Sequence, residues 1–221
     1  MIPPEQSARF VAKMEDVLSV YRRPYDRRRP VVCMDEMSRQ LIGEAQEPRP
    51  LKPGRKKRYD HHFQRNGVVN LFTFFEPLAS WRMVMTRRQR TARDWAECVG
   101  QLLTTHYPDA ETVVLVMDNF NTHKIKNFYQ TFEAKTARRF ARRLEIHYTP
   151  EYGSWMNMAE IEQSVLARQC LSARIPTLEA MRTQTRRWAK RRNQADATVN
   201  WQFRTDDARI KLRSLYPNIE G

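Results

Sequence analysis

Two kinds of hydrophobic pattern alternate along this chain: short apolar runs, and longer stretches in which apolar residues recur every three or four positions. Short runs rich in β-branched and aromatic residues, bounded by charged or turn-forming positions, are typical of β-strands. Runs of this kind cover residues 31–34, 67–75, 81–85, 112–117 and 145–148. Because the first run stops at Asp35, we expect a short first strand that ends there.

The stretches with three- and four-residue spacing predict amphipathic helices. They cover residues 7–20, 92–106, 125–132, 137–144, 157–171, 177–192 and 205–215. In chain order, three strands precede alternating helices and strands, which is typical of an α/β fold with a mixed sheet flanked by helices. A chain of 221 residues fits one main domain. We therefore expect an N-terminal helix and basic linker over residues 1–30, and the main domain with its C-terminal helices over residues 31–221.

Composition adds a strong positive charge, because 39 Lys and Arg residues oppose 25 Asp and Glu residues, for a net charge of +14. Such a charge favours polyanionic partners, with nucleic acid first and an anionic membrane surface second. No apolar run approaches the roughly 20 residues of a membrane-spanning helix, and the N-terminus lacks a signal-peptide pattern. The three cysteines form no Cys-x-x-Cys pair. We expect a cytoplasmic protein with no membrane partner and no zinc site.

The positive charge is gathered in four runs, at residues 49–58, 82–93, 135–143 and 174–192. Any single run fits an ordinary solvated surface equally well, since charge runs commonly have no ligand. A membrane-surface helix would pair its charges with a bulky apolar face, and the last run has few bulky apolar residues. The four runs together favour nucleic acid.

Acidic residues follow two of the predicted strands, since Asp35 ends the first apolar run and Asp118 the fourth. A carboxylate near a core costs free energy unless it is paired or coordinates a metal, so acids in such places are candidates for an active site. Both would lie where a buried strand meets solvent and could line one cleft. Asp is also common in turns after strands, and Asp118-Asn119 fits a turn or a helix cap as well.

A third acid would come from Glu151, Glu160 or Glu162, near the start of the predicted helix 157–171. At about 100° per residue, Glu160 lies on a polar face with Asn157, whereas Glu162 falls between two apolar groups. Glu162 fits a site residue that faces the sheet, or a buried acid with a partner such as an arginine. Periodicity does not choose between Glu160 and Glu162.

Three carboxylates without a Cys or His pair at ligand spacing suit a hard cation such as Mg²⁺ or Mn²⁺. Two such ions can activate a water or a 3′-hydroxyl and stabilise the leaving oxygen during attack on phosphorus. A basic surface that holds phosphates and an acidic site that binds metal would then serve one reaction, the cutting or joining of a nucleic-acid backbone.

Three acid-bearing segments resemble those of a known family. They are Val31–Glu36 (VVCMDE), Leu115–His123 (LVMDNFNTH), and His147–Pro150 (HYTP) leading to Ser154–Glu160 (SWMNMAE). In this order they resemble the IS630 family of bacterial transposases, which belongs with the Tc1/mariner elements.

The resemblance implies an RNase H-like fold with a five-stranded sheet and a DDE triad of Asp35, Asp118 and Glu160, which are both the catalytic residues and the ligands of two Mg²⁺ or Mn²⁺ ions. The family pattern Asn-x-x-Glu selects Glu160, because Asn157 stands three residues before it, and leaves Glu162 as the runner-up. Supporting roles are expected for Asn119, His123 and Asn157.

The resemblance further implies a bacterial, nucleoid-associated DDE-type transposase that cleaves transposon ends and transfers the strands into target DNA, by a cut-and-paste route. Its partners would be double-stranded DNA and a second copy of the chain, with the loop 49–62 as a clamp against the second subunit or the DNA. The basic residues expected to contact DNA are Arg55, Lys56, Lys57, Arg58, Arg186, Arg187, Lys190 and Arg191.

Family members usually carry a helix-turn-helix region ahead of the catalytic domain, which this sequence lacks. We therefore expect the catalytic part of a split, truncated or trimmed transposase, with the recognition part supplied separately. Two alternatives remain open at this point. One is a structure-selective nuclease of the same fold, and the other is a catalytically silent DNA-binding remnant of a transposase.

Overall fold

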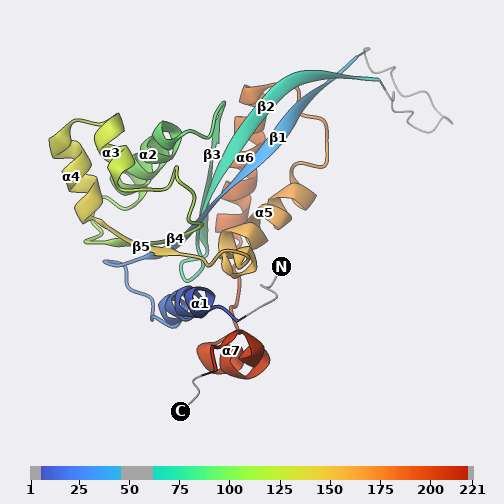
Figure 1. Cartoon of the computed structure of the whole chain (residues 1–221). Coiled ribbons are helices and arrows are strands. Elements are labelled where there is room, and N and C mark those ends of the chain that lie inside the picture. Colours follow the sequence, from blue (N-terminus) through green and yellow to red (C-terminus); the bar gives the residue numbers. More distant parts are fainter. Residues whose placement is uncertain (1–5, 46–61, 219–221) are drawn as a thin grey trace.

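A mixed five-stranded sheet forms the centre of the computed structural model, which describes residues 6–45 and 62–218. The strands are β1 (Val31–Glu44), β2 (Phe63–Glu76), β3 (Trp81–Arg87), β4 (Val113–Met117) and β5 (Leu144–Tyr148). Their order in the sheet is β3-β2-β1-β4-β5, with β1, β2 and β3 antiparallel and β4 parallel to both β1 and β5 (Figure 1). The predicted mixed sheet is thus confirmed.

The helices lie close to the predicted stretches. They are α1 (Ala8–Tyr21), α2 (Ala92–Gln101), α3 (Lys126–Thr131), α4 (Ala134–Arg142), α5 (Met158–Gln169), α6 (Leu178–Gln194) and α7 (Thr205–Lys211). Short helical turns, η1 (Leu102–His106), η2 (Ser154–Met156) and η3 (Arg213–Leu215), complete the order. The helices α1, α2, α5 and α6 begin at polar caps whose side chains accept a hydrogen bond from the first turn, namely Ser7, Thr91, Asn157 and Thr177.

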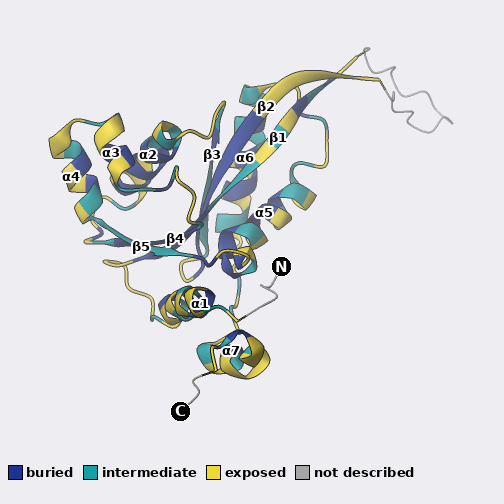
Figure 2. Cartoon of the chain, in the orientation of Figure 1, coloured by how far each residue is buried: buried dark blue, intermediate teal, exposed yellow. Residues whose placement is uncertain are grey.

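Alternation along the strands separates two cores, one on each face of the sheet. Val32 and Met34 pack with α2, α3 and α4 on one face. Val31 and Cys33 pack with α1, α7 and the start of α5 on the other. The outer parts of β1 and β2 pack in a third cluster with α5 and α6. Figure 2 shows the buried residues concentrated on the strands and on the inner sides of these helices.

The first strand is much longer than expected, and this prediction was wrong. β1 does not end at Asp35 but continues for nine residues to Glu44, because β2 pairs with it along its length and supplies partners for its backbone groups. Asp35 lies opposite Thr73 in this register. Farther out, the pairing shifts between Gln40 and Ile42, and Gly67 on β2 adopts a φ of +98°, which glycine tolerates without strain.

The N-terminal and C-terminal segments meet on the α1 face of the sheet. The Ser7 backbone N–H donates to the Leu215 carbonyl at 3.0 Å. The other end of α1 contacts η2, where the Tyr21 hydroxyl donates to the Met156 carbonyl at 2.7 Å. Of the predicted clamp 49–62, residues 49–61 lie outside the described residues, and with them Arg55, Lys56, Lys57 and Arg58. Within the ranges 6–45 and 62–218, no helix is both long and apolar enough to cross a membrane.

Candidate active site

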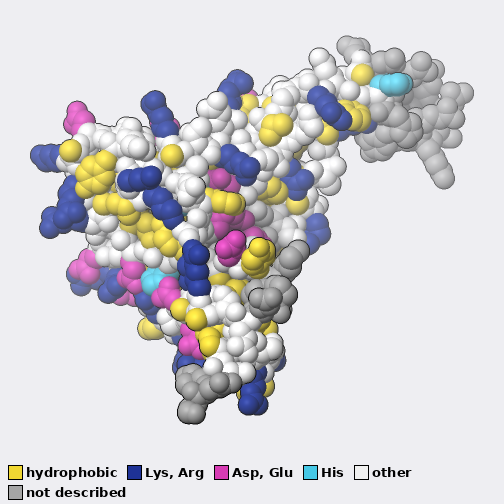
Figure 3. Space-filling model, in the orientation of Figure 1, with side chains coloured by type: hydrophobic (Ala, Val, Ile, Leu, Met, Phe, Trp, Pro, Cys, Tyr) yellow, Lys and Arg dark blue, Asp and Glu magenta, His cyan; other side chains and the backbone are white. Residues whose placement is uncertain are grey.

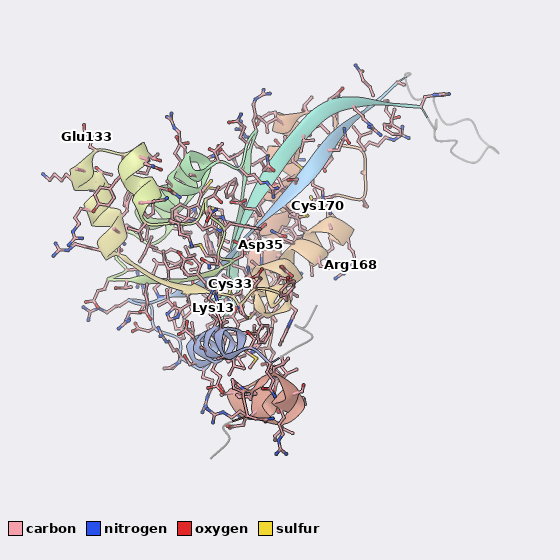
Figure 4. All side chains as sticks on the ribbon, viewed as in Figure 1. Lys13, Cys33, Asp35, Glu133, Arg168 and Cys170 are labelled. Atoms are coloured by element: carbon pink, nitrogen blue, oxygen red, sulfur yellow. The ribbon has the colours of Figure 1, made fainter. Side chains whose placement is uncertain are left out.

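The register of two parallel strands places Asp35 beside Asp118. Cys33 on β1 pairs with Val116 on β4, and each aspartate stands two residues farther along its chain. Because alternate residues of a strand share a face, Asp35 lies on the same face as Val31 and Cys33, the face that α5 covers. Figure 4 shows Asp35 near the middle of the molecule, where β1 passes α5.

Glu160 reaches the same region from the first turn of α5, and Asn157 fixes where that helix begins. The Asn157 side chain is buried; its Oδ1 accepts from the Ala159 N–H at 3.1 Å, and its Nδ2 donates to the Met34 carbonyl at 2.9 Å. One residue therefore caps α5 and ties it to β1 immediately before Asp35. These two hydrogen bonds give Asn157 a structural role at the start of α5, and its supporting role in catalysis stays a prediction.

The electrostatics of the acids show that they influence one another. The pKa of the Asp35 carboxyl is raised to about 7, mainly by burial and in addition by the negative charges of Glu160, Asp118 and Glu36, while a hydrogen bond from the Glu36 backbone opposes the shift. The pKa of Glu160 is raised by burial and by Asp118, while a hydrogen bond with the Ser154 side chain opposes the shift. Asp35 is thus within electrostatic reach of both Asp118 and Glu160.

Glu162 has a different environment from Glu160, although it is only two residues away. Its carboxylate is fully buried, 3.2 Å from Arg82 Nε on β3 and 2.8 Å from Arg192 Nη2 on α6. This matches the alternative of a buried acid paired with arginine. Glu160, by contrast, is one of the acids whose negative charge raises the pKa of Asp35.

Asp118 is held by a histidine. Its Oδ1 lies 2.5 Å from Nδ1 of His123, whose Nε2 lies 3.0 Å from Oε1 of Glu36. Burial acts to lower the pKa of His123, but the carboxylates of Asp118 and Glu36 outweigh it and raise this pKa to about 9. A supporting role for His123 is expected from the sequence, but its contact with Glu36 is not. The alternation of β1 shows only that Glu36 lies on the opposite face of the sheet from Asp35.

Other predicted residues lie farther from these contacts. Asn119 is exposed and its Oδ1 accepts a hydrogen bond from Lys124 Nζ. The four predicted DNA-contact residues of α6 are exposed and form no ion pair within the described part of the chain: Arg186, Arg187, Lys190 and Arg191. On the face shown in Figure 3, acidic side chains gather near the centre, with Lys and Arg side chains beside them over α2, α3 and α4.

The donor set suits a divalent cation by its chemistry. Asp35, Asp118 and Glu160 offer carboxylate oxygens only, the ligands that Mg²⁺ and Mn²⁺ prefer, and their mutual repulsion is relieved by a positive ion. Within the described residues, however, no three His, Cys, Asp or Glu side chains are gathered closely enough to form a ready-made metal site. One of the three acids, Asp118, instead has its Oδ1 2.5 Å from Nδ1 of His123.

Comparison with solved structures supports the fold. The Mos1 mariner paired end complex with Mn is 14% identical, with a TM-score of 0.53 over 97% of this chain and 62% of that chain. The Mos1 strand transfer complex is 15% identical, with a TM-score of 0.54 over 86% of this chain and 56% of that chain. This chain therefore spans less than two thirds of either one. The likeness confirms the predicted RNase H-like fold.

Comparison by sequence identifies the family. No curated protein matches the chain. A family model described as DDE superfamily endonuclease matches residues 30–182, a range that contains Asp35, Asp118 and Glu160. Because the match covers more than half of the 221 residues, this chain belongs to the DDE superfamily endonucleases.

Proposed function

We propose that this chain is the catalytic domain of an IS630-like DNA transposase of the Tc1/mariner superfamily, which cleaves transposon ends and transfers them into target DNA by cut-and-paste. The observation that carries the proposal is geometric: Asp35 and Asp118 follow paired positions of β1 and β4, and Asn157 ties the start of α5, which carries Glu160, to β1. The three acids are far apart in the sequence. Family membership and a fold shared with two Mos1 transposition complexes support it.

In this proposal Asp35, Asp118 and Glu160 are the catalytic residues and hold two Mg²⁺ or Mn²⁺ ions. When bound, such ions lower the pKa of a coordinated water and stabilise charge on the attacking and leaving oxygens at phosphorus. The chain supplies the placement of the carboxylates, through strand β1, His123 and the anchored start of α5. A Mos1 structure with Mn supports the choice of cation.

The proposed partner is double-stranded DNA, both transposon ends and target. A net charge of +14 and the Lys and Arg side chains that flank the acids in Figure 3 suit contacts with phosphates. The remaining parts of the proposal are a homodimer, a separate helix-turn-helix part for end recognition and a bacterial, nucleoid-associated location. They rest on the resemblance of the three acid-bearing segments.

The test is cleavage and joining of a labelled duplex that carries the terminal repeat, in Mg²⁺ or Mn²⁺. We expect 3′-strand cleavage followed by joining to a second duplex, and a loss of at least about 100-fold in Asp118→Ala. The matched control is Asp109→Asn, which changes an exposed aspartate near the opposite end of β4. Full activity of Asp118→Ala would defeat the proposal.

The same assay separates the alternatives. Cleavage of junctions or hybrids without any joining would identify a structure-selective nuclease. Salt-sensitive DNA binding without uptake of Mn²⁺ would identify a catalytically silent remnant. Mn²⁺ uptake that is lost in Asp35→Asn is the result expected for the transposase.

A further inference from the structure

Glu36 is a buried acid that the proposed triad does not use. It follows Asp35 on β1, so the two side chains leave opposite faces of the sheet. Asp35 lies on the α5 face, whereas Glu36 shares its face with Val32 and Met34, against α2 and α3. Its side chain is only 5% exposed, and Oε1 lies 3.0 Å from Nε2 of His123. A buried carboxylate is costly unless it has a partner, and the imidazole is that partner.

His123 connects Glu36 to the site, and the surrounding contacts fix its ring. The side chain is completely buried, between the rings of Trp95 and Phe120 at centroid distances of 5.9 and 5.8 Å. Its carbonyl accepts from the Tyr148 hydroxyl at 2.8 Å. With Nε2 on Glu36, the ring presents Nδ1 to Asp118.

Asp118 is the acid that most needs such support. Asp35 lies inside a strand and Glu160 inside a helix, but Asp118 follows the end of β4, where no regular element fixes its backbone. His123 Nδ1 lies at ion-pair distance from Oδ1, 2.5 Å away, and forms its hydrogen bond with the Asp118 backbone carbonyl at 3.3 Å, while Oδ2 has no hydrogen bond or ion pair among the described residues. A side chain held by one oxygen presents the other in a defined direction.

We propose that Glu36 is a positioning residue that acts through His123 to orient the Asp118 carboxylate toward Asp35 and Glu160. The inference rests on the proposed function, because it assigns Asp118 to the metal site. The physical basis is general: acids that hydrogen-bond the far side of a side chain in contact with a metal ligand restrict its orientation, and their loss weakens metal binding.

The experiment measures Mn²⁺ binding to the metal-free protein by electron paramagnetic resonance of free Mn²⁺, together with the Mn²⁺ concentration that half-saturates end cleavage. Glu36→Leu removes the acceptor, so we expect the dissociation constant for Mn²⁺ and the half-saturating Mn²⁺ concentration both to rise about 10- to 100-fold. Glu36→Gln keeps an oxygen that accepts from Nε2–H, so its effect is smaller. The control is Glu97→Gln on α2, a partly exposed glutamate paired with Arg93. It keeps wild-type values.

Thermal unfolding of each variant distinguishes positioning from simple stabilisation. Lower thermal stability with unchanged Mn²⁺ half-saturation, at a temperature where each variant is folded, would overturn the inference. So would unchanged Mn²⁺ binding in both Glu36 variants. If the unaltered protein neither binds Mn²⁺ nor cleaves, the proposed function fails and this inference fails with it, whereas normal wild-type values with unaffected Glu36 variants defeat this inference alone.

Discussion

At the scale of single residues, Asp35 is the clearest case of a carboxyl whose charged form is disfavoured by the fold. Burial and the neighbouring acids raise its pKa to about 7, far above the value near 3.9 of an unfolded chain. Between these two values the folded protein binds the proton and the unfolded chain does not, so this carboxyl makes the protein less stable as pH rises from about 4 to about 7.

Asp35→Asn removes that penalty. We expect its melting temperature in EDTA to exceed that of the wild type by at least about 2 °C at pH 8, and the difference to shrink as pH falls toward 4. Thermal unfolding followed by circular dichroism at pH 4, 5, 6, 7 and 8 measures the gap, with Asp109→Asn scanned in parallel. A gap of the same size at every pH would contradict this account of Asp35.

The two neighbouring glutamates of α5 differ in what surrounds them, and matched amide variants test the difference. Glu162→Gln leaves Arg82 and Arg192 without their carboxylate, and breaking a buried pair in this way costs about 3–5 kcal/mol of unfolding free energy. Glu160→Gln keeps or raises stability, because it removes a carboxylate with a raised pKa, but loses end cleavage. Urea unfolding and the cleavage assay measure the two effects. If instead Glu162→Gln is stable but inactive while Glu160→Gln remains active, Glu162 and not Glu160 is the catalytic acid.

At the scale of elements, the start of α5 is fixed to β1 through one side chain, and Asn157→Asp isolates that link. Asp keeps the oxygen that caps the helix but lacks the Nδ2 that donates to the Met34 carbonyl. We expect a loss of about 1–3 kcal/mol in urea unfolding and reduced cleavage by the folded variant, because the start of α5, which carries Glu160, is no longer tied to β1.

Thr177 supplies the control for this change, because its side chain caps α6 in the same way. Thr177→Ala loses about 1 kcal/mol through the cap alone and leaves cleavage by the folded protein unchanged. If Asn157→Asp loses stability but cleaves as well as the Thr177 variant, the link to β1 serves stability and not the placement of Glu160.

The sequence predicted most elements because their patterns are local. The spacing of apolar residues located the helices, and five apolar runs located the strands. The length of β1 escaped prediction, since polar residues continue the strand and only pairing with the distant β2 keeps it extended. The same contrast between local and long-range features applies to the site. The candidate acids could be named from the sequence. The Glu36–His123 contact could not, because it joins positions 87 residues apart and no local pattern encodes it.

At the scale of the whole molecule, the fold positions acids from three regions of the chain: Asp35 on β1, Asp118 after β4 and Glu160 on α5. Most of the positive charge lies on the surface. An acidic site and a negatively charged nucleic-acid backbone repel each other, so the proposed function requires the surrounding cations to hold DNA near the acids. The division of the chain at residue 30 remains a prediction. The structure adds that α1 packs on the same core as β1 and the start of α5.

The exposed cations of α6 allow a test of whether DNA contacts one surface of the protein or is attracted only by its total charge. Each phosphate that a cation neutralises contributes about −0.9 to the slope of log K against log salt concentration for duplex DNA. If Arg186, Arg187, Lys190 and Arg191 all contact the backbone, replacing the four by Ala reduces the magnitude of that slope by about 3 to 4, nearly equally for all DNA sequences. Fluorescence anisotropy of a labelled duplex in 50–300 mM KCl measures it.

A second quadruple variant removes the same charge from another surface. Its four exposed residues lie on or beside α1 and α7: Arg9, Arg27, Lys211 and Arg213. Docking of DNA along α6 predicts a much smaller change in slope for this control. Equal changes in the two variants would show that the net charge of +14 attracts DNA without a preferred surface, and the assignment of α6 as a DNA contact would then be wrong.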